Sequence, residues 1–145
     1  MISDWDDAYA NAPHIPDGAA YPFEVSQDEE GMIRLGSAPM WRAMLADLAS
    51  GMPAAVISAR FHKGLGIAVA RLAVDLLRMH ASERIVALSG GSFQNRLLLD
   101  ELERRLEADG VTVLIHAKVP ASDGGLALGQ AAVAAARRVA GHDGN

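Results

Sequence analysis

Residues 84–115, RIVALSGGSFQNRLLLDELERRLEADGVTVLI, contain the pattern that decides the fold class. Arg84–Leu88 is a short apolar run that ends at two glycines, which is typical of a buried strand. Val111–Ile115, which follows Gly110, is a second short apolar run, and the leucine spacing between the two runs predicts an amphipathic helix over Asn95–Ala108. Strand, helix and strand at this spacing predict a βαβ unit with parallel strands and a right-handed crossover.

Further helices are expected on both sides of this unit. Apolar residues at helical spacing predict one helix over Pro39–Ser50 and a longer one over Pro53–His80. Gly64 and Gly66 interrupt the longer pattern, which indicates close packing against another backbone or a break in the helix. An alanine-rich run predicts a last helix over Leu126–Ala140. The expected fold class is therefore α/β, rich in helices and with short parallel strands.

Composition limits the kind of protein. The 145 residues have a mass of 15.3 kDa, which is the size of one domain. Half of them are hydrophobic but only 5% are aromatic, so the core must consist mainly of Ala, Leu and Val. The absence of cysteine excludes disulfides, thiolate zinc sites and cysteine nucleophiles. The sequence has no apolar run of membrane-spanning length and no signal-peptide pattern, so we expect a cytoplasmic protein without membrane contact.

Charge is distributed unevenly along the chain. Residues 1–31 contain eight acids and no Lys or Arg, whereas the remainder contains ten acids and thirteen bases. Turn-forming residues fill positions 1–20, so we expect an irregular acidic leader there, followed by one domain over 21–145. The leader could shield a surface or be a solvated arm, and we favour the arm. Tyr21–Val25 and Met32–Leu35 are expected to be short extended pieces of that domain. The scattered bases, without interleaved aromatic residues, argue against nucleic-acid binding.

Two loops follow the predicted strands, at the end where open α/β sheets bind ligands. In the first, Ser89–Asn95, two adjacent glycines allow a ligand to approach the backbone, and the following helix N-terminus offers N–H groups to an anion. The second, Pro120–Gly125, contains Asp123. Because both loops lie at corresponding strand ends, we expect them to face one cleft. His62 and His116 are candidates for the same cleft, the alternative being packed or surface histidines.

Each loop also has a plainer interpretation. The first could be an ordinary strand-to-helix turn with Asn95 or Ser92 as the helix N-cap. Asp123 could cap the last helix, or its carboxylate could hold a hard metal ion or a metal-bound phosphate. The histidines form no i,i+4 pair, so we do not expect the chain to assemble a histidine metal site alone.

Three motifs, in this order, resemble the C-terminal part of the hydrogenase-maturation carbamoyltransferase family, HypF. They are ISARFHKGLG at 57–66, VALSGGSFQNRLLLDEL at 86–102 and VPASDGGLALGQAA at 119–132. The family pattern is approximately F-H-N-x-L, then S-G-G-V-F-Q-N-x-x-L, then P-x-N-D-G-G-L-A-L-G-Q. The similarity extends over about residues 21–140. Lys63, Ser92 and Ser122 stand where the family pattern has Asn, Val and Asn.

The resemblance implies a fold and a chemistry. The fold would be the second lobe of a two-lobed actin-like, ribonuclease H-like ATPase domain, related to threonylcarbamoyl-transferase enzymes. Such enzymes form carbamoyl adenylate from carbamoyl phosphate and ATP, and pass the carbamoyl group to a cysteine of a partner in [NiFe] hydrogenase maturation. Asp123 would complete a divalent metal site for Mg, or for Fe or Zn. The implied nucleotide-binding residues are Ser89, Gly90, Gly91, Phe93, Gln94, Asn95, Gly124 and Gly125.

The family also carries parts that 145 residues do not accommodate, including a first lobe with a histidine-rich metal motif. The resemblance therefore implies a lobe that is inactive alone and works with a missing first lobe or a larger carbamoyltransferase. The alternative is a non-catalytic module for homodimerisation or assembly, because a lobe without its partner exposes apolar surface. A third alternative is a small Rossmann-like nucleotide or phosphosugar binder.

Overall fold

The computed structural model describes residues 12–80, 83–120 and 123–142. Its centre is the βαβ unit of β3 (Ile85–Leu88), α4 (Arg96–Ala108) and β4 (Thr112–Ile115). The two strands pair in parallel, with Ile85 opposite Thr112 and Leu88 opposite Ile115. The predicted strand, helix and strand are thus confirmed, with bounds within one residue of those expected.

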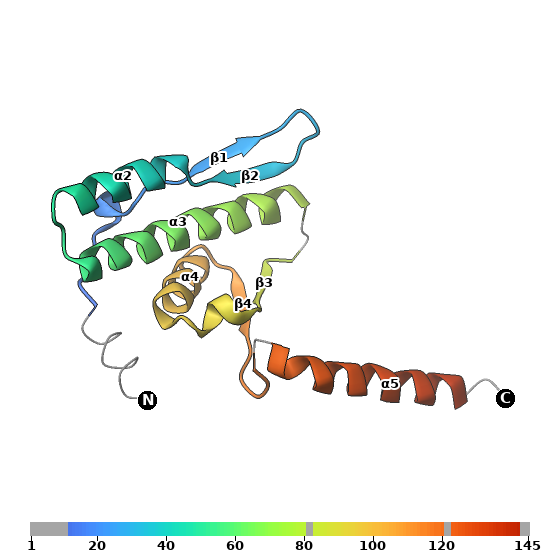
Figure 1. The fold of residues 1–145 in the computed structure, drawn as a ribbon. Helices are drawn as coiled ribbons and strands as arrows, with labels where there is room; N and C mark the ends of the chain where they lie inside the picture. Colours follow the sequence, from blue (N-terminus) through green and yellow to red (C-terminus); the bar gives the residue numbers. More distant parts are fainter. Residues whose placement is uncertain (1–11, 81–82, 121–122, 143–145) are drawn as a thin grey trace.

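The core lies between α4 and the long helix α3 (Ala54–His80) (Figure 1). Leucines repeat along α4 at intervals of four residues, which places them on one face of the helix. That face is buried against α3 and against the strands. The buried cluster consists of Ala70, Val74, Leu88, Leu98, Leu102, Leu106 and Val111.

The helix α3 runs without a break through its two internal glycines. A Cβ atom at Gly64 would lie 2.1 Å from the carbonyl oxygen of Tyr21, and one at Gly66 would lie 2.6 Å from Cγ of Glu101. Both positions therefore require glycine-sized residues, because the N-terminal segment and α4 pack directly on the helix. The prediction of close packing is confirmed, and at Gly64 the neighbour is backbone.

A hairpin and a helix complete the N-terminal half. Strands β1 (Glu24–Gln27) and β2 (Ile33–Gly36) are antiparallel, with Glu24 opposite Gly36. Helix α2 (Ala38–Ala49) follows with Pro39 in its first turn and packs on α3, which lies between α2 and α4 (Figure 1).

The described part of the leader, residues 12–20, is attached to the body of the protein, so the expected solvated arm is wrong for this stretch. Asp17 accepts a hydrogen bond from Nη2 of Arg105 at 2.7 Å and forms an ion pair with Lys63 at 3.2 Å. The hydrogen bond from Arg105 is the largest influence that lowers the pKa of Asp17. The carboxylate of Asp17 thus attaches this stretch to α3 through Lys63 and to α4 through Arg105. Residues 1–11 lie outside the described residues.

Tyr21 joins this segment to both N-terminal helices. Its ring is buried, its hydroxyl donates a 2.6 Å hydrogen bond to Oδ2 of Asp47, and the Arg60 guanidinium stacks over the ring at 4.8 Å. Burial, and then the hydrogen bond to Asp47, raises the pKa of Tyr21 to about 12. Arg60 also donates a hydrogen bond to the carbonyl oxygen of Ala19 at 2.6 Å.

Helix α5 (Leu126–His142) projects away from the rest of the molecule (Figure 1). It follows the short 3-10 helix η3 (Asp123–Gly125), with which it makes its main contacts. Leu126, Leu128 and Val133 are each more than half exposed. Within the described part of the chain, no helix combines the length and apolar character needed to cross a membrane.

Candidate functional site

The glycine loop after β3 forms an open turn. Gly90 has φ +113° and ψ 161°, a conformation open essentially to glycine alone. The 3-10 helix η2 (Gly91–Gln94) follows, and a Cβ atom at Gly91 would meet no other atom within 4 Å. The two glycines thus have different roles: Gly90 shapes the backbone, and Gly91 leaves open space beside it.

One end of this loop is linked to the neighbouring strand. Ser89 follows Leu88 of β3, and His116 follows Ile115 of β4, its partner in the parallel ladder. Nε2 of His116 lies 2.9 Å from Oγ of Ser89, within hydrogen-bond distance. His116 therefore contacts the loop, whereas its place in a cleft shared by the two loops stays a prediction.

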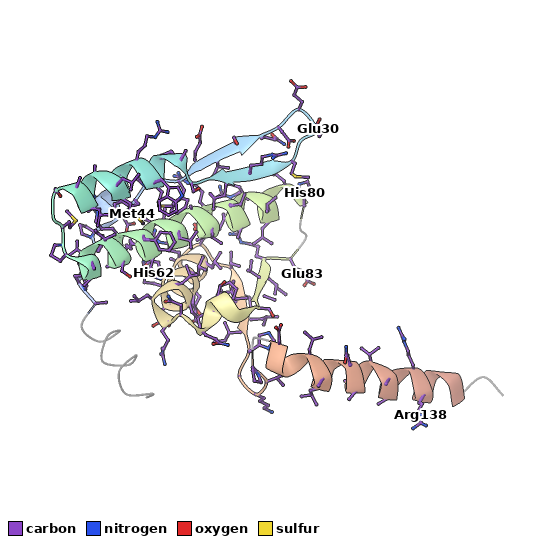
Figure 2. The ribbon with its side chains drawn as sticks, viewed as in Figure 1. Glu30, Met44, His62, His80, Glu83 and Arg138 are labelled. Carbon is purple, nitrogen blue, oxygen red and sulfur yellow. The ribbon has the colours of Figure 1, made fainter. Side chains whose placement is uncertain are left out.

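The other end of the loop is linked to α3. Asn95 is the N-cap of α4, and its Oδ1 accepts a hydrogen bond from the backbone N–H of Leu98 at 3.3 Å. Its Nδ2 lies 2.7 Å from Nε2 of His62, and Nδ1 of His62 lies 2.8 Å from the carbonyl oxygen of Ser58. The cap at Asn95 is confirmed. His62 lies on the side of α3 that faces α4 (Figure 2).

The second loop has a close backbone approach of its own. A Cβ atom at Gly125 would lie 2.7 Å from the carbonyl oxygen of Pro120, so only glycine fits there without a shift. Asp123 is exposed and begins η3, whereas Gly125 directly precedes α5. Asp123 is thus not the residue adjacent to α5, and its role as a metal ligand stays a prediction. Ser122 lies outside the described residues, and the shared cleft of the two loops also stays a prediction.

Metal binding needs more ligands than this part of the chain brings together. In residues 12–80, 83–120 and 123–142, no three histidine, aspartate or glutamate side chains gather in a way that could hold an ion. Asp123 by itself does not make a site for a divalent cation, which takes several oxygen or nitrogen ligands. A metal ion at Asp123 would require ligands beyond those that the described residues bring together there.

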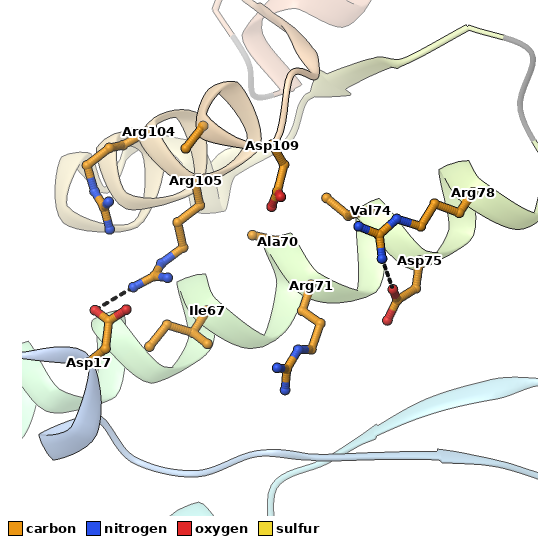
Figure 3. Close-up of a pocket in the computed structure, with 11 residues that line it drawn as sticks. Asp17, Ile67, Ala70, Arg71, Val74, Asp75, Arg78, Arg104, Arg105 and Asp109 are labelled. Atoms are coloured by element: carbon orange, nitrogen blue, oxygen red, sulfur yellow. Dashed lines mark hydrogen bonds and ion pairs between the residues drawn. The ribbon is translucent and has the colours of Figure 1, made fainter.

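Two cavities lie outside the glycine loop and were not expected from the sequence. The larger, of about 540 Å³, lies between α3 and α4 and is bordered by charges of both signs (Figure 3). Arg105 faces Asp17 there, and Arg78 lies 3.6 Å from Asp75. The smaller, of about 320 Å³, has His62 and Lys63 in its wall. These cavities lie where the leader, α3 and α4 contact one another. These segments are far apart in the sequence, so no local sequence pattern predicts the contact.

Comparison with known families places these features in context. The sequence model of the family described as carbamoyltransferase, Kae1-like domain, second subdomain, matches residues 8–130. The chain belongs to this carbamoyltransferase family. The match begins within the segment 1–20, includes the first two motifs and covers the third as far as Gln130.

Curated relatives are longer HypF proteins. Carbamoyltransferase HypF2 of Cupriavidus necator is 39% identical over 94 residues, which are 65% of this chain and 12% of that protein. The carbamoyltransferase HypF homolog of the same organism is 37% identical over 108 residues, 74% of this chain and 27% of that protein. Carbamoyltransferase HypF of Rhodobacter capsulatus is 41% identical over 90 residues, 62% of this chain and 12% of that protein. The chain thus spans about a quarter or less of each of these relatives.

Solved HypF structures share the fold. A full-length HypF crystallised in a phosphate- and nucleotide-bound form superposes with a TM-score of 0.72 at 33% identity, over 83% of this chain and 16% of that one. The HypF of T. kodakarensis gives a TM-score of 0.64 at 28% identity, over 88% of this chain and 15% of that one. The chain is therefore a HypF C-terminal domain in fold, helix-rich α/β with a short parallel strand pair, as the motifs implied.

Proposed function

We propose that this chain is the nucleotide-binding second lobe of a HypF-type carbamoyltransferase. The observation that carries the proposal is the Ser89–Asn95 loop, which is open on one side and held at both ends by hydrogen-bonded histidines. Such a loop, between a parallel strand and a helix N-terminus, suits the phosphates of a nucleotide. A similar HypF structure is described as phosphate- and nucleotide-bound, which supports the same assignment here.

The proposed reaction has two stages. In the first, water releases inorganic phosphate from carbamoyl phosphate, and the resulting carbamate attacks the α-phosphorus of ATP, which gives carbamoyl adenylate and pyrophosphate. In the second, a cysteine thiol of a partner protein in [NiFe] hydrogenase maturation loses its proton and takes the carbamoyl group, and AMP leaves. In this scheme the present chain binds ATP through Ser89, Gly90, Gly91, Phe93, Gln94 and Asn95, with Gly124 and Gly125 at the second loop. Asp123 would supply one carboxylate to a divalent metal ion, for which Mg, Fe and Zn are the candidates. The chain itself supplies no complete ligand set among its described residues.

A first lobe is the partner that this proposal requires. The chain covers only 15–16% of the two full-length HypF chains that it superposes on, and its family is named as the second of two or more subdomains. Helix α5 leaves Leu126, Leu128 and Val133 exposed directly after the loop of Asp123. A first lobe, or a larger carbamoyltransferase that contains one, would cover these side chains and complete the metal site.

The experiment is an ATP titration in the presence of Mg²⁺, followed by calorimetry, with the chain alone and with the first lobe of a HypF relative added. We expect measurable binding when the first lobe is present. Gly91→Val should weaken this binding at least tenfold, on the order of 1.4 kcal/mol or more, because it fills the open space beside the loop. Its melting temperature should not change, because that space is empty in the free chain.

Gly18→Val is the matched control, since Gly18 also has no neighbour within 4 Å and lies outside the loop. It should leave both ATP affinity and melting temperature unchanged. If ATP does not bind even with the first lobe present, the proposed function is wrong.

A second candidate function, a non-catalytic assembly module, is favoured by the outer face of α2. Trp41, Leu45 and Leu48 are 53%, 57% and 63% exposed and follow each other at helical spacing, so they form one apolar stripe. Under this alternative, sedimentation equilibrium at micromolar concentration should give a homodimer, and Leu45→Glu should convert it to a monomer. A strictly monomeric wild-type chain that retains no larger carbamoyltransferase would contradict it.

A further inference from the structure

In the hydrogen bond between Asn95 and His62, the side chain of Asn95 is the donor and the ring of His62 is the acceptor. Oδ1 of Asn95 already accepts the hydrogen bond from the Leu98 amide, so its Nδ2 must donate to Nε2 of His62. Nε2 is therefore the unprotonated nitrogen of the ring. Nδ1 then carries the hydrogen and donates it to the carbonyl oxygen of Ser58, 2.8 Å away. Only the neutral Nδ1–H tautomer satisfies all three contacts.

These contacts form one continuous chain of hydrogen bonds between two helices. It runs from the first turn of α4, through the side chains of Asn95 and His62, to the backbone of α3. The ring of His62 is held further by an edge contact with Phe61, with centroids 5.2 Å apart. Asn95 can neither rotate its amide nor leave the cap without losing a hydrogen bond at one of its two ends.

We infer that His62 is a positioning residue: acting through Asn95, it fixes the end of the Ser89–Asn95 loop and the first turn of α4. The inference rests on the proposed function insofar as this loop is the nucleotide site. Under it, His62 is neither a metal ligand nor a group that touches the nucleotide. His116 holds the Ser89 end of the loop separately, so a change at His62 should loosen only the Asn95 end.

Two substitutions distinguish the hydrogen bonds made by the two ring nitrogens of His62. In His62→Gln the side-chain oxygen reaches the position of Nε2 and can still accept from Asn95. In His62→Asn the shorter amide can still donate to Ser58 but does not reach Asn95. Loss of one net hydrogen bond changes an equilibrium by roughly three- to tenfold. We therefore expect the Leu98 amide to exchange its hydrogen about three- to tenfold faster in His62→Asn, and within twofold of wild type in His62→Gln.

The measurement is NMR on the uniformly ¹⁵N-labelled full chain. The imidazole ¹⁵N shifts report the tautomer of His62, and amide exchange reports the loop. The internal reference is the amide of Thr112, which donates to the carbonyl oxygen of Arg84 at 2.8 Å in the strand pair and should not change in either variant. An Nε2–H tautomer in the wild-type chain, or equal exchange at Leu98 in the two variants, would overturn the inference.

Nucleotide affinity provides the functional half of the test. With the first lobe present, His62→Asn should weaken ATP binding by the same three- to tenfold, and His62→Gln should restore it. Equal ATP affinity in the two variants overturns the positioning role while the proposed function stands. If the wild-type chain binds no ATP, the proposed function fails, and the exchange data alone decide whether His62 fixes the loop.

Discussion

Gly64→Ala is expected to lower the free energy of unfolding by about 3 kcal/mol, because the added methyl group meets backbone that cannot turn away. The new Cβ atom would lie 2.1 Å from the carbonyl oxygen of Tyr21 and 3.1 Å from its backbone nitrogen. The backbone N–H of Tyr21 donates to the carbonyl oxygen of Arg60 at 3.2 Å, and this hydrogen bond would be displaced as well. Urea unfolding followed by circular dichroism measures the change.

Gly129→Ala is the control for helix propensity. Gly129 lies in α5 with no neighbouring atom within 4 Å, so alanine there should leave the stability equal or raise it by up to ~1 kcal/mol. A Gly64→Ala variant as stable as the wild-type chain would mean that the segment around Tyr21 does not pack on α3 in solution.

Leu106→Ala is expected to cost about 3–4 kcal/mol, since the truncation leaves a cavity in the centre of the core. The Leu106 side chain is 0% exposed and belongs to the cluster that joins α3, α4 and the strand pair. The same urea titration measures the loss. Because α4 and β3 carry the two ends of the glycine loop, this variant should also lose the loop conformation.

Leu45→Ala removes the same number of atoms from a position that is 57% exposed on α2. It should change the stability by less than about 0.5 kcal/mol. A loss below 1 kcal/mol at Leu106 would show that the α3–α4 core is looser than the packing described above.

Elements with a local signal were predictable from the sequence. The leucines of α4 recur every four residues, and the apolar runs on either side of it are short and have glycine close to one end, so the helix and the strands follow from local patterns alone. The sequence also offered Asn95 as one of two candidates, with Ser92, for the N-cap of this helix, because a capping residue lies close to the first turn that it caps. The order of the three motifs was specific enough to indicate the family.

Contacts between distant parts of the chain were not predictable in this way. His62 and Asn95 are 33 residues apart, and Asp17 and Arg105 are 88 apart, so no periodicity relates them. The charge asymmetry between leader and body was visible, but it did not indicate which arginine Asp17 contacts. The backbone neighbour of Gly64 was suggested only as one of two possibilities, because a glycine pattern does not identify its neighbour.

Two sets of contacts, which differ in their exposure to solvent, attach the leader to the body of the protein. The carboxylate of Asp17 is 61% exposed, so dissolved ions screen its attraction to Lys63 and Arg105. The Tyr21–Asp47–Arg60 contacts, a few residues further along, are largely shielded from water and much less sensitive to salt. Higher ionic strength therefore weakens the ion pairs of Asp17 and has much less effect on the Tyr21–Asp47–Arg60 contacts. Since Asp17 lines the cavity between α3 and α4, the salt concentration of a buffer sets how firmly that part of the cavity wall is held in place.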